Sequence, residues 1–473
     1  MDFSAANATL WNPILQLAII AAIIVLATLL RHKIPFIRRS LIPTAVLGGF
    51  ILLALRATGV LRVDVSFLEA ITYHGIALGF IALSLRVPKP EDKGAHGRLV
   101  GLKSGAIIVS SYLIQAFFGL LITLGLAYTV MPGLFKAAGI LLPMGFGQGP
   151  GQANNVGSTY EASFGFVGGR SFGLAIAAAG YLCACIVGVV YLNILVKKGK
   201  VRRTTYDEIS GSVNIDTFQD KGEIPIAESL DKLSMQVALV LVVYGVTYLA
   251  TWGIVSLLEA VAPGLAATVS GILWGFNFMI GSLLAMALRS AFARLRKGKL
   301  MTRQYQNNYL LSRLSGLAFD IMIVAGIGSI DIGDLSGMWV PFILLTVTGA
   351  VVTFLHLRFT CKRVYKGYYH EGFVSMYGMM TGTISSGILL LRELDADLAT
   401  PAANNLVAGS GFAIALGAPL LVLIGMAPKS DAMTFLVLGL VVVYYVALMG
   451  VIFIRGKAEK KSAKVEKETA DIG

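Results

Sequence analysis

The chain has 473 residues, of which 56% are hydrophobic and only 14% are charged, and its formal net charge is +13. Its apolar runs are long enough to cross a bilayer and do not alternate with polar residues. The sequence therefore predicts an all-α polytopic membrane protein and argues against a transmembrane β-barrel. The basic residues are dispersed among the segments between these runs, which argues against nucleic-acid binding.

Taken in chain order, the apolar runs predict about eleven transmembrane helices. They cover residues 13–30, 41–57, 67–85, 104–126, 165–195, 233–257, 265–287, 308–329, 338–357, 404–426 and 433–454. Two weaker, glycine-rich segments lie between the fourth and fifth helix of each half, at about 134–158 and 371–393. We expect both to be re-entrant loops, because such backbone is tolerated at membrane depth only where protein or a water-filled cavity shields it.

The charges between the predicted helices indicate the topology. If the N-terminus is outside, the inner segments hold most of the 39 Lys and Arg residues, as is typical of cytoplasmic loops. The sequence therefore predicts an outer N-terminus and a cytoplasmic C-terminus.

Five crossings in each half would insert the two halves in opposite orientations. We expect an N-terminal repeat at 1–198 and a C-terminal repeat at 233–426, each with one re-entrant loop. The polar segment 199–232 is predicted to be a cytoplasmic connector, 427–454 an extra helix, and 455–473 a basic cytoplasmic tail. Inverted repeats with interrupted helices are a recurrent plan of secondary transporters.

The two glycine-rich segments have a composition suited to a binding site. Glycine allows tight turns that expose backbone N–H groups, which can hold a carboxylate. Neutral carbonyl, amide and hydroxyl oxygens suit a small monovalent cation such as Na⁺. A lone Gly-x-x-x-Gly more often serves helix packing, but glycines alternating with amides favour a site. The candidate residues are Gly145, Gly147, Gln148, Gly149, Gly151, Gln152, Asn154, Gly378, Thr381, Gly382, Thr383, Ser385 and Ser386.

Two charged residues are further candidates, because an unpaired charge within a bilayer is costly. Asp320 falls near the middle of the predicted helix 308–329 and can bind a cation or take up a proton, or be satisfied by neighbouring helices. Arg170 falls near the outer end of 165–195. Its guanidinium can pair with a substrate carboxylate or, in a structural role, with Glu161.

These residues give the chain a resemblance to the bacterial sodium/glutamate symporters. It lies in the segments 147–153 (GQGPGQA) and 42–49 (IPTAVLGG) and in the order of the helices. The chain departs from the family pattern at Gln148, where a histidine is expected, and at Met380, where a glycine is expected. The resemblance implies sodium-coupled glutamate uptake across the bacterial inner membrane, Na⁺ as coupling ion with no other cofactor, and a homodimer.

The expected function is therefore secondary transport, without enzymatic activity. The alternative is a proton- or sodium-driven carrier or exchanger for another small carboxylate, with the coupling ion on Asp320. A channel is disfavoured, because selectivity filters commonly repeat around an axis and these two loops differ. An intramembrane hydrolase would need a serine with a histidine base or two facing aspartates, whereas Asp320 is the single aspartate in the predicted helices and His74 is remote from it in the sequence.

Overall fold

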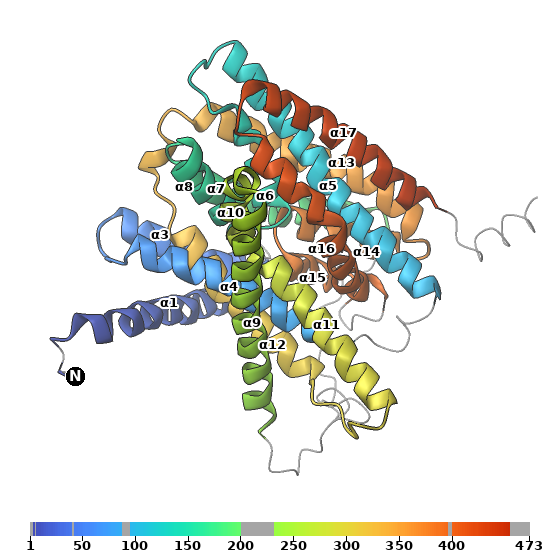
Figure 1. Cartoon of the computed structure of the whole chain (residues 1–473). Helices are drawn as coiled ribbons and strands as arrows, with labels where there is room; N and C mark the ends of the chain where they lie inside the picture. The colour runs from blue at the N-terminus through green and yellow to red at the C-terminus, as the bar shows by residue number, and fades with distance from the viewer. Residues whose placement is uncertain are drawn as a thin grey trace, which may run out of the picture.

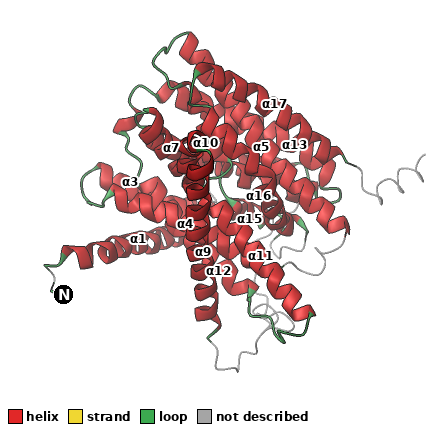
Figure 2. Cartoon of the chain, in the orientation of Figure 1, coloured by secondary structure: helices red, strands yellow, loops and turns green. Residues whose placement is uncertain are grey.

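The computed structural model describes residues 3–4, 6–39, 42–87, 95–199, 231–395 and 400–454. Within these residues the chain consists of helices and connecting loops, and no strand occurs (Figures 1 and 2). Nearly all of the predicted connector 199–232 and the whole basic tail 455–473 lie outside the described residues.

Ten of the described helices are long and apolar enough to cross a membrane. They are α1 (Ala8–Lys33), α4 (Val65–Leu85), α5 (Ala95–Tyr128), α8 (Gly169–Lys197), α9 (Lys232–Val261), α11 (Asn277–Lys297), α12 (Asn308–Gly328), α13 (Trp339–Val364), α16 (Ala402–Met426) and α17 (Asp431–Phe453). The protein is thus a multi-pass helical membrane protein, as predicted.

Shorter helices connect or interrupt these ten. They are α2 (Pro35–Arg39), α3 (Thr44–Ala57), the 3₁₀ helix η2 (Lys136–Ile140), α6 (Leu141–Phe146), α7 (Pro150–Phe164), α10 (Pro263–Gly275), the 3₁₀ helix η5 (Gly333–Leu335), α14 (Tyr369–Thr381) and α15 (Ile384–Leu391).

Two predicted membrane crossings differ from the structure. The segment 41–57 forms a helix only from Thr44, because Pro43 stands at its N-cap. At 14 residues, α3 spans about 21 Å, less than the ~30 Å hydrocarbon core. The predicted helix 265–287 is interrupted at Phe276, whose φ of −106° and ψ of 23° end α10 and precede α11.

The helices form two bundles. The first bundle consists of α1–α4 and α9–α12, in which α12 packs on α3 and α4, and α11 packs on α4 and α9. The second bundle consists of α5–α8 and α13–α17, in which α5 packs on α13, α16 and α17, and α8 packs on α6, α7 and α14. In Figure 1 most of the first bundle lies in the lower part of the view and most of the second in the upper part.

Both predicted glycine-rich segments are interrupted helices in the second bundle. The first comprises α6 and α7, separated by residues 147–149, and the second comprises α14 and α15, separated by residues 382–383. Contacts of α7 with α4, α10 and α12 place the first interruption at the boundary between the bundles.

Candidate functional site

The first interruption has its conformation because of glycine and proline. Gly149 adopts φ +82° and ψ −172°, a backbone region essentially restricted to glycine. Pro150 follows as the first helical residue of α7, where its missing N–H costs no hydrogen bond and its fixed φ suits the helix. The chain therefore stops one helix and starts the next within three residues.

The two interruptions meet in space. A Cβ atom built on Gly149 would lie 3.2 Å from Cγ2 of Thr383 and 3.6 Å from the carbonyl oxygen of Gly382. Gly149 is the N-cap of α7 and Thr383 the N-cap of α15, so two helix N-termini converge. First-turn N–H groups lack intrahelical acceptors, and each N-terminus carries a partial positive charge. Their convergence is a favourable environment for an anion.

Helix α8 crosses this junction and closes one side of it. A Cβ atom on Gly180 would collide with the carbonyl oxygen of Thr381 and with the ring of Phe146, the last residues of α14 and α6. The next residue, Tyr181, is fully buried, and its hydroxyl would be 3.7 Å from a Cβ atom on Gly149. The close approach of α8 at Gly180 thus brings a phenol to the junction.

Buried polar atoms without hydrogen-bond partners gather at this junction. They are the hydroxyls of Tyr181, Thr383 and Ser386. In the first turn of α7, both amide atoms of Gln152 are likewise without a partner. The Tyr181 and Thr383 hydroxyls interact with each other, but neither has a partner at full hydrogen-bond geometry. Gln152 and Ser386 are each the third residue of their helices, α7 and α15.

Buried polar groups in native proteins are nearly always hydrogen-bonded, and leaving one unpaired costs about 1–3 kcal/mol. Several such groups at one point are therefore expected where a ligand, an ion or water completes the set. Gln152 is fully buried and Ser386 is 2% exposed, so within the chain these groups have no bulk solvent to bond with.

A cavity lies beside the junction, between the two bundles. Its empty volume is about 830 Å³, which includes space open to solvent. All of the polar groups come from the second bundle: the hydroxyl-bearing Tyr112, Thr383 and Ser410, the amide of Gln148, and the backbone of Gly382. The same bundle also contributes apolar side chains: Ile108, Met379, Ile384, Ala413, Ile414 and Leu420. The first bundle contributes apolar side chains only: Ile76, Phe80, Phe276, Phe278, Met279, Phe319 and Met322.

The structure brings part of the predicted site together at the cavity and the junction. Gly147, Gln148, Gly382 and Thr383 line the cavity, while Gly149 lies at the junction beside it.

Other predicted site residues have packing surroundings. Cβ atoms would collide with α8 at Gly145, with Ile76 and Met322 at Gly151, and with Gly387 of α15 at Gly378. The Thr381 hydroxyl donates 2.8 Å to the carbonyl of Tyr377 in its own helix. Asn154 is buried, with an amide contact of 3.5 Å to Asn155 and an unpartnered Oδ1. The side chain of Ser385 is outside the described residues.

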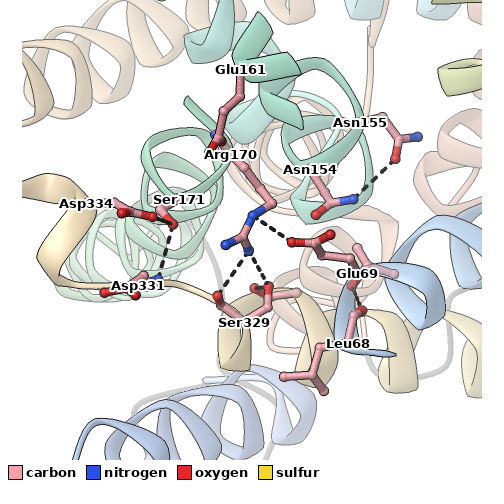
Figure 3. A network of polar contacts seen from close by, with 12 residues as sticks. Leu68, Glu69, Asn154, Asn155, Glu161, Arg170, Ser171, Ser329, Asp331 and Asp334 are labelled. Atoms are coloured by element: carbon pink, nitrogen blue, oxygen red, sulfur yellow. Dashed lines mark hydrogen bonds and ion pairs between the residues drawn. The ribbon is translucent and has the colours of Figure 1, made fainter. Parts of the chain in front are cut away.

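Arg170 lies away from the cavity in a polar network (Figure 3). Its Nε is 2.8 Å from Oε1 of Glu69, and its Nη1 donates 3.1 Å to the carbonyl of Ser329. Glu161 accepts from the backbone N–H of Arg170 at 3.1 Å, rather than from the guanidinium as the structural alternative supposed. The network ties α8 to α4 and to the end of α12.

Asp320 does not line the cavity. Its side chain, at the middle of α12, is exposed in the chain and within electrostatic range of Tyr181. A carboxylate in the middle of a membrane-spanning helix is costly unless it is paired or hydrated, so Asp320 is a candidate for the coupling ion.

The break at Phe276, which the sequence did not predict, places Phe276, Phe278 and Met279 in the cavity lining. Tyr73 donates 2.9 Å to the carbonyl of Trp274, and Asn155 donates to the carbonyl of Gly275. These side chains satisfy carbonyls that the end of α10 leaves free. The break turns the Phe276 ring into the cavity lining.

A search of protein-family models finds none that matches this chain, and no curated protein matches it.

Proposed function

We propose that this protein is a secondary active transporter that couples the movement of a small carboxylate to that of Na⁺ by alternating access. The observation that carries the proposal is the junction of the two interrupted helices. There, two helix N-termini and unpartnered buried polar groups meet beside a cavity. Interrupted helices that meet near a bound substrate and ion are typical of secondary transporters.

The substrate carboxylate is assigned to the converging N-termini. Pro150 has no N–H, so the donors that α7 can offer in its first turn are the backbone N–H groups of Gly151 and Gln152, and α15 offers those of Ile384 and Ser385. The two helix dipoles favour negative charge at the same point. The hydroxyl of Thr383 is within reach of the same point and has no partner at full hydrogen-bond geometry. A carboxylate bound there would be recognised by several donors without needing an arginine.

Sodium is assigned to oxygens of the same junction. The unpartnered oxygens of Gln152, Tyr181, Thr383 and Ser386 are neutral, and neutral oxygens suit a monovalent cation that must bind and be released. The individual ligands are not assigned. A cation bound next to the carboxylate offsets its charge, so each favours binding of the other, which is the thermodynamic basis of symport.

The two bundles supply the parts that alternating access requires. Both interrupted helices belong to the second bundle, and the cavity lies against the first. Motion of one bundle against the other would open the junction first to one side of the membrane and then to the other. The pairing of α3 with α12 and of α11 with α4 supports two inverted repeats, with α6–α7 and α14–α15 as their re-entrant loops.

The resemblance to sodium/glutamate symporters adds further proposals. It makes L-glutamate the first substrate to test and favours a homodimer in the bacterial inner membrane, with an outer N-terminus.

One observation favours a second candidate, an exchanger or proton-driven carrier. Asp320 is a carboxylate at the middle of α12 that is exposed in the chain. If it carries the coupling ion as a proton, Asp320→Asn abolishes the pH dependence of uptake; if Na⁺ binds at the junction, the sodium dependence survives this change.

Transport by the purified protein in proteoliposomes tests the proposal. Labelled L-glutamate and a panel of other labelled carboxylates are supplied under an inward Na⁺ gradient, and under a K⁺ gradient as control. We expect carboxylate accumulation that requires Na⁺ and is blocked by the unlabelled compound. Absence of uptake for every carboxylate, in vesicles that demonstrably hold the gradient, would refute sodium-coupled carboxylate transport.

A further inference from the structure

We infer that the substrate is a monocarboxylate with an apolar, branched or aromatic body, rather than a dicarboxylate such as glutamate. The inference rests on the proposed function and names the substrate class of the same site. It follows from how polarity is divided between the two walls of the cavity.

The polar groups of the cavity all belong to the second bundle, whose wall also carries apolar side chains, whereas the wall of the first bundle is wholly apolar. Thr383, Gln148 and the backbone of Gly382 line the cavity from the second bundle, next to the converging helix N-termini. Every described side chain that the first bundle contributes is Ile, Phe or Met. A ligand that contacts both walls therefore needs a polar end and an apolar end.

The apolar wall is a connected aromatic cluster. The ring centroids of Phe80 and Phe278 are 4.9 Å apart, those of Phe80 and Phe319 are 5.4 Å apart, and those of Phe276 and Phe278 are 5.9 Å apart. Met279 and Met322 flank these rings in the lining. Thioethers and aromatic rings contact branched or aromatic groups favourably.

No charged side chain lines the cavity among the described residues. A second carboxylate or an ammonium group at the apolar wall would lose its hydration without gaining a partner, which is strongly unfavourable. Arg170, the predicted partner of a substrate carboxylate, is engaged by Glu69 and the Ser329 carbonyl outside the cavity. Glutamate carries both an extra carboxylate and an ammonium group, so this wall selects against it.

The apolar wall also has a simpler explanation, which the experiment must separate from substrate recognition. An apolar surface lets one bundle slide over the other without breaking hydrogen bonds. If that is its only role, truncating one ring changes the transport rate for all substrates alike. If the wall contacts the substrate, truncation raises the half-saturation concentration only for substrates that have an apolar body.

The experiment compares 2-oxo acids that share one head group. Sodium-driven uptake into proteoliposomes is measured for pyruvate, 4-methyl-2-oxopentanoate and 2-oxoglutarate, with L-glutamate beside them. We expect 4-methyl-2-oxopentanoate to saturate at a concentration about tenfold below that of pyruvate, and the two dicarboxylates to compete poorly.

Phe278→Ala is then compared with Phe359→Ala. Phe359 is 58% exposed on the outer face of α13, which makes it a matched control away from the cavity. We expect Phe278→Ala to raise the half-saturation concentration of 4-methyl-2-oxopentanoate about tenfold and to leave that of pyruvate nearly unchanged. Phe359→Ala should alter neither.

The outcomes separate the two proposals. Sodium-driven uptake of glutamate or 2-oxoglutarate with higher affinity than the branched monocarboxylate would overturn the substrate class and leave sodium-coupled transport standing. An equal rate change for all substrates in Phe278→Ala would overturn the role of the wall. Absence of sodium-dependent uptake of any carboxylate would instead refute the proposed function. Because the substrate panel uses the unmodified protein, it decides the substrate class even if Phe278→Ala does not fold.

Discussion

Replacement of Gly149 by alanine tests the junction most sharply. The φ of +82° and ψ of −172° at this residue would cost an alanine about 1–3 kcal/mol of strain. The new Cβ would also be 3.2 Å from Cγ2 of Thr383, which is tighter than an ordinary contact. We expect the strain to be relieved by separating the N-termini of α7 and α15.

Such a separation should appear in substrate binding. If the strain displaces the two N-termini, the binding free energy of Na⁺ and carboxylate is weakened by a similar amount. Because about 1.4 kcal/mol is a factor of ten, we expect both half-saturation concentrations to rise roughly tenfold or more. The assay is sodium-driven uptake into proteoliposomes, with the thermal midpoint of the detergent-solubilised protein measured in parallel.

Gly165→Ala provides the matched control at the other end of α7. Gly165 has φ +70° and ψ 23°, so alanine there also carries a left-handed penalty, about 1–2 kcal/mol, but its Cβ would meet nothing within 4 Å. We expect a comparable loss of stability with unchanged half-saturation. Wild-type affinities in folded Gly149→Ala would refute the reasoning, as would equal affinity losses in both variants.

Three other predictions address single contacts. Thr383→Val removes a hydroxyl that has no partner at full hydrogen-bond geometry, so the thermal midpoint should hold or rise. The half-saturation concentration for Na⁺ should increase about tenfold; an unchanged sodium dependence would exclude this hydroxyl as a sodium ligand. Arg170→Ala leaves the Glu69 carboxylate without its 2.8 Å partner and should lower the free energy of unfolding by about 1–3 kcal/mol, and a double-mutant cycle with Glu69→Ala should show coupling. Asp320→Asn should retain sodium-dependent uptake, measured at several pH values; complete loss of sodium dependence would place the coupling ion at Asp320.

The polytopic helical architecture could be predicted because long apolar runs report directly on membrane-spanning helices. The two interruptions at 147–149 and 382–383 fall inside the two glycine-rich segments that the sequence indicates. Glycines beside amides and hydroxyls within a few residues can be recognised without knowing the fold. That they face each other, and that Tyr181 completes the junction, depends on α8 packing against both. A tyrosine within an apolar helix gives no such indication.

The remaining features depend on contacts between distant parts of the chain. The break at Phe276 lies inside a run apolar enough to span a membrane, and it is stabilised by Tyr73 and Asn155 from other helices. The aromatic wall could not be predicted for a related reason. Phe278 and Phe319 lie in apolar runs whose pattern does not distinguish a side chain that lines a cavity from one that faces lipid. Arg170 shows the opposite case: its charge stands out in the sequence, but in the structure it forms an ion pair with Glu69 and does not line the cavity.

Protection of a single thiol at the cavity tests the central claim, that substrate and Na⁺ bind beside the junction. Ser410 lines the cavity and bonds only within its own helix in the described contacts, to the carbonyl of Leu406 at 2.7 Å. Ser410→Cys is therefore a conservative probe, made in a chain whose own cysteines are replaced. With transport retained, Na⁺ together with a transported carboxylate should slow alkylation of this thiol at least about tenfold, more than either alone. An alkylation rate that is unchanged at saturating Na⁺ and substrate would contradict binding at this cavity.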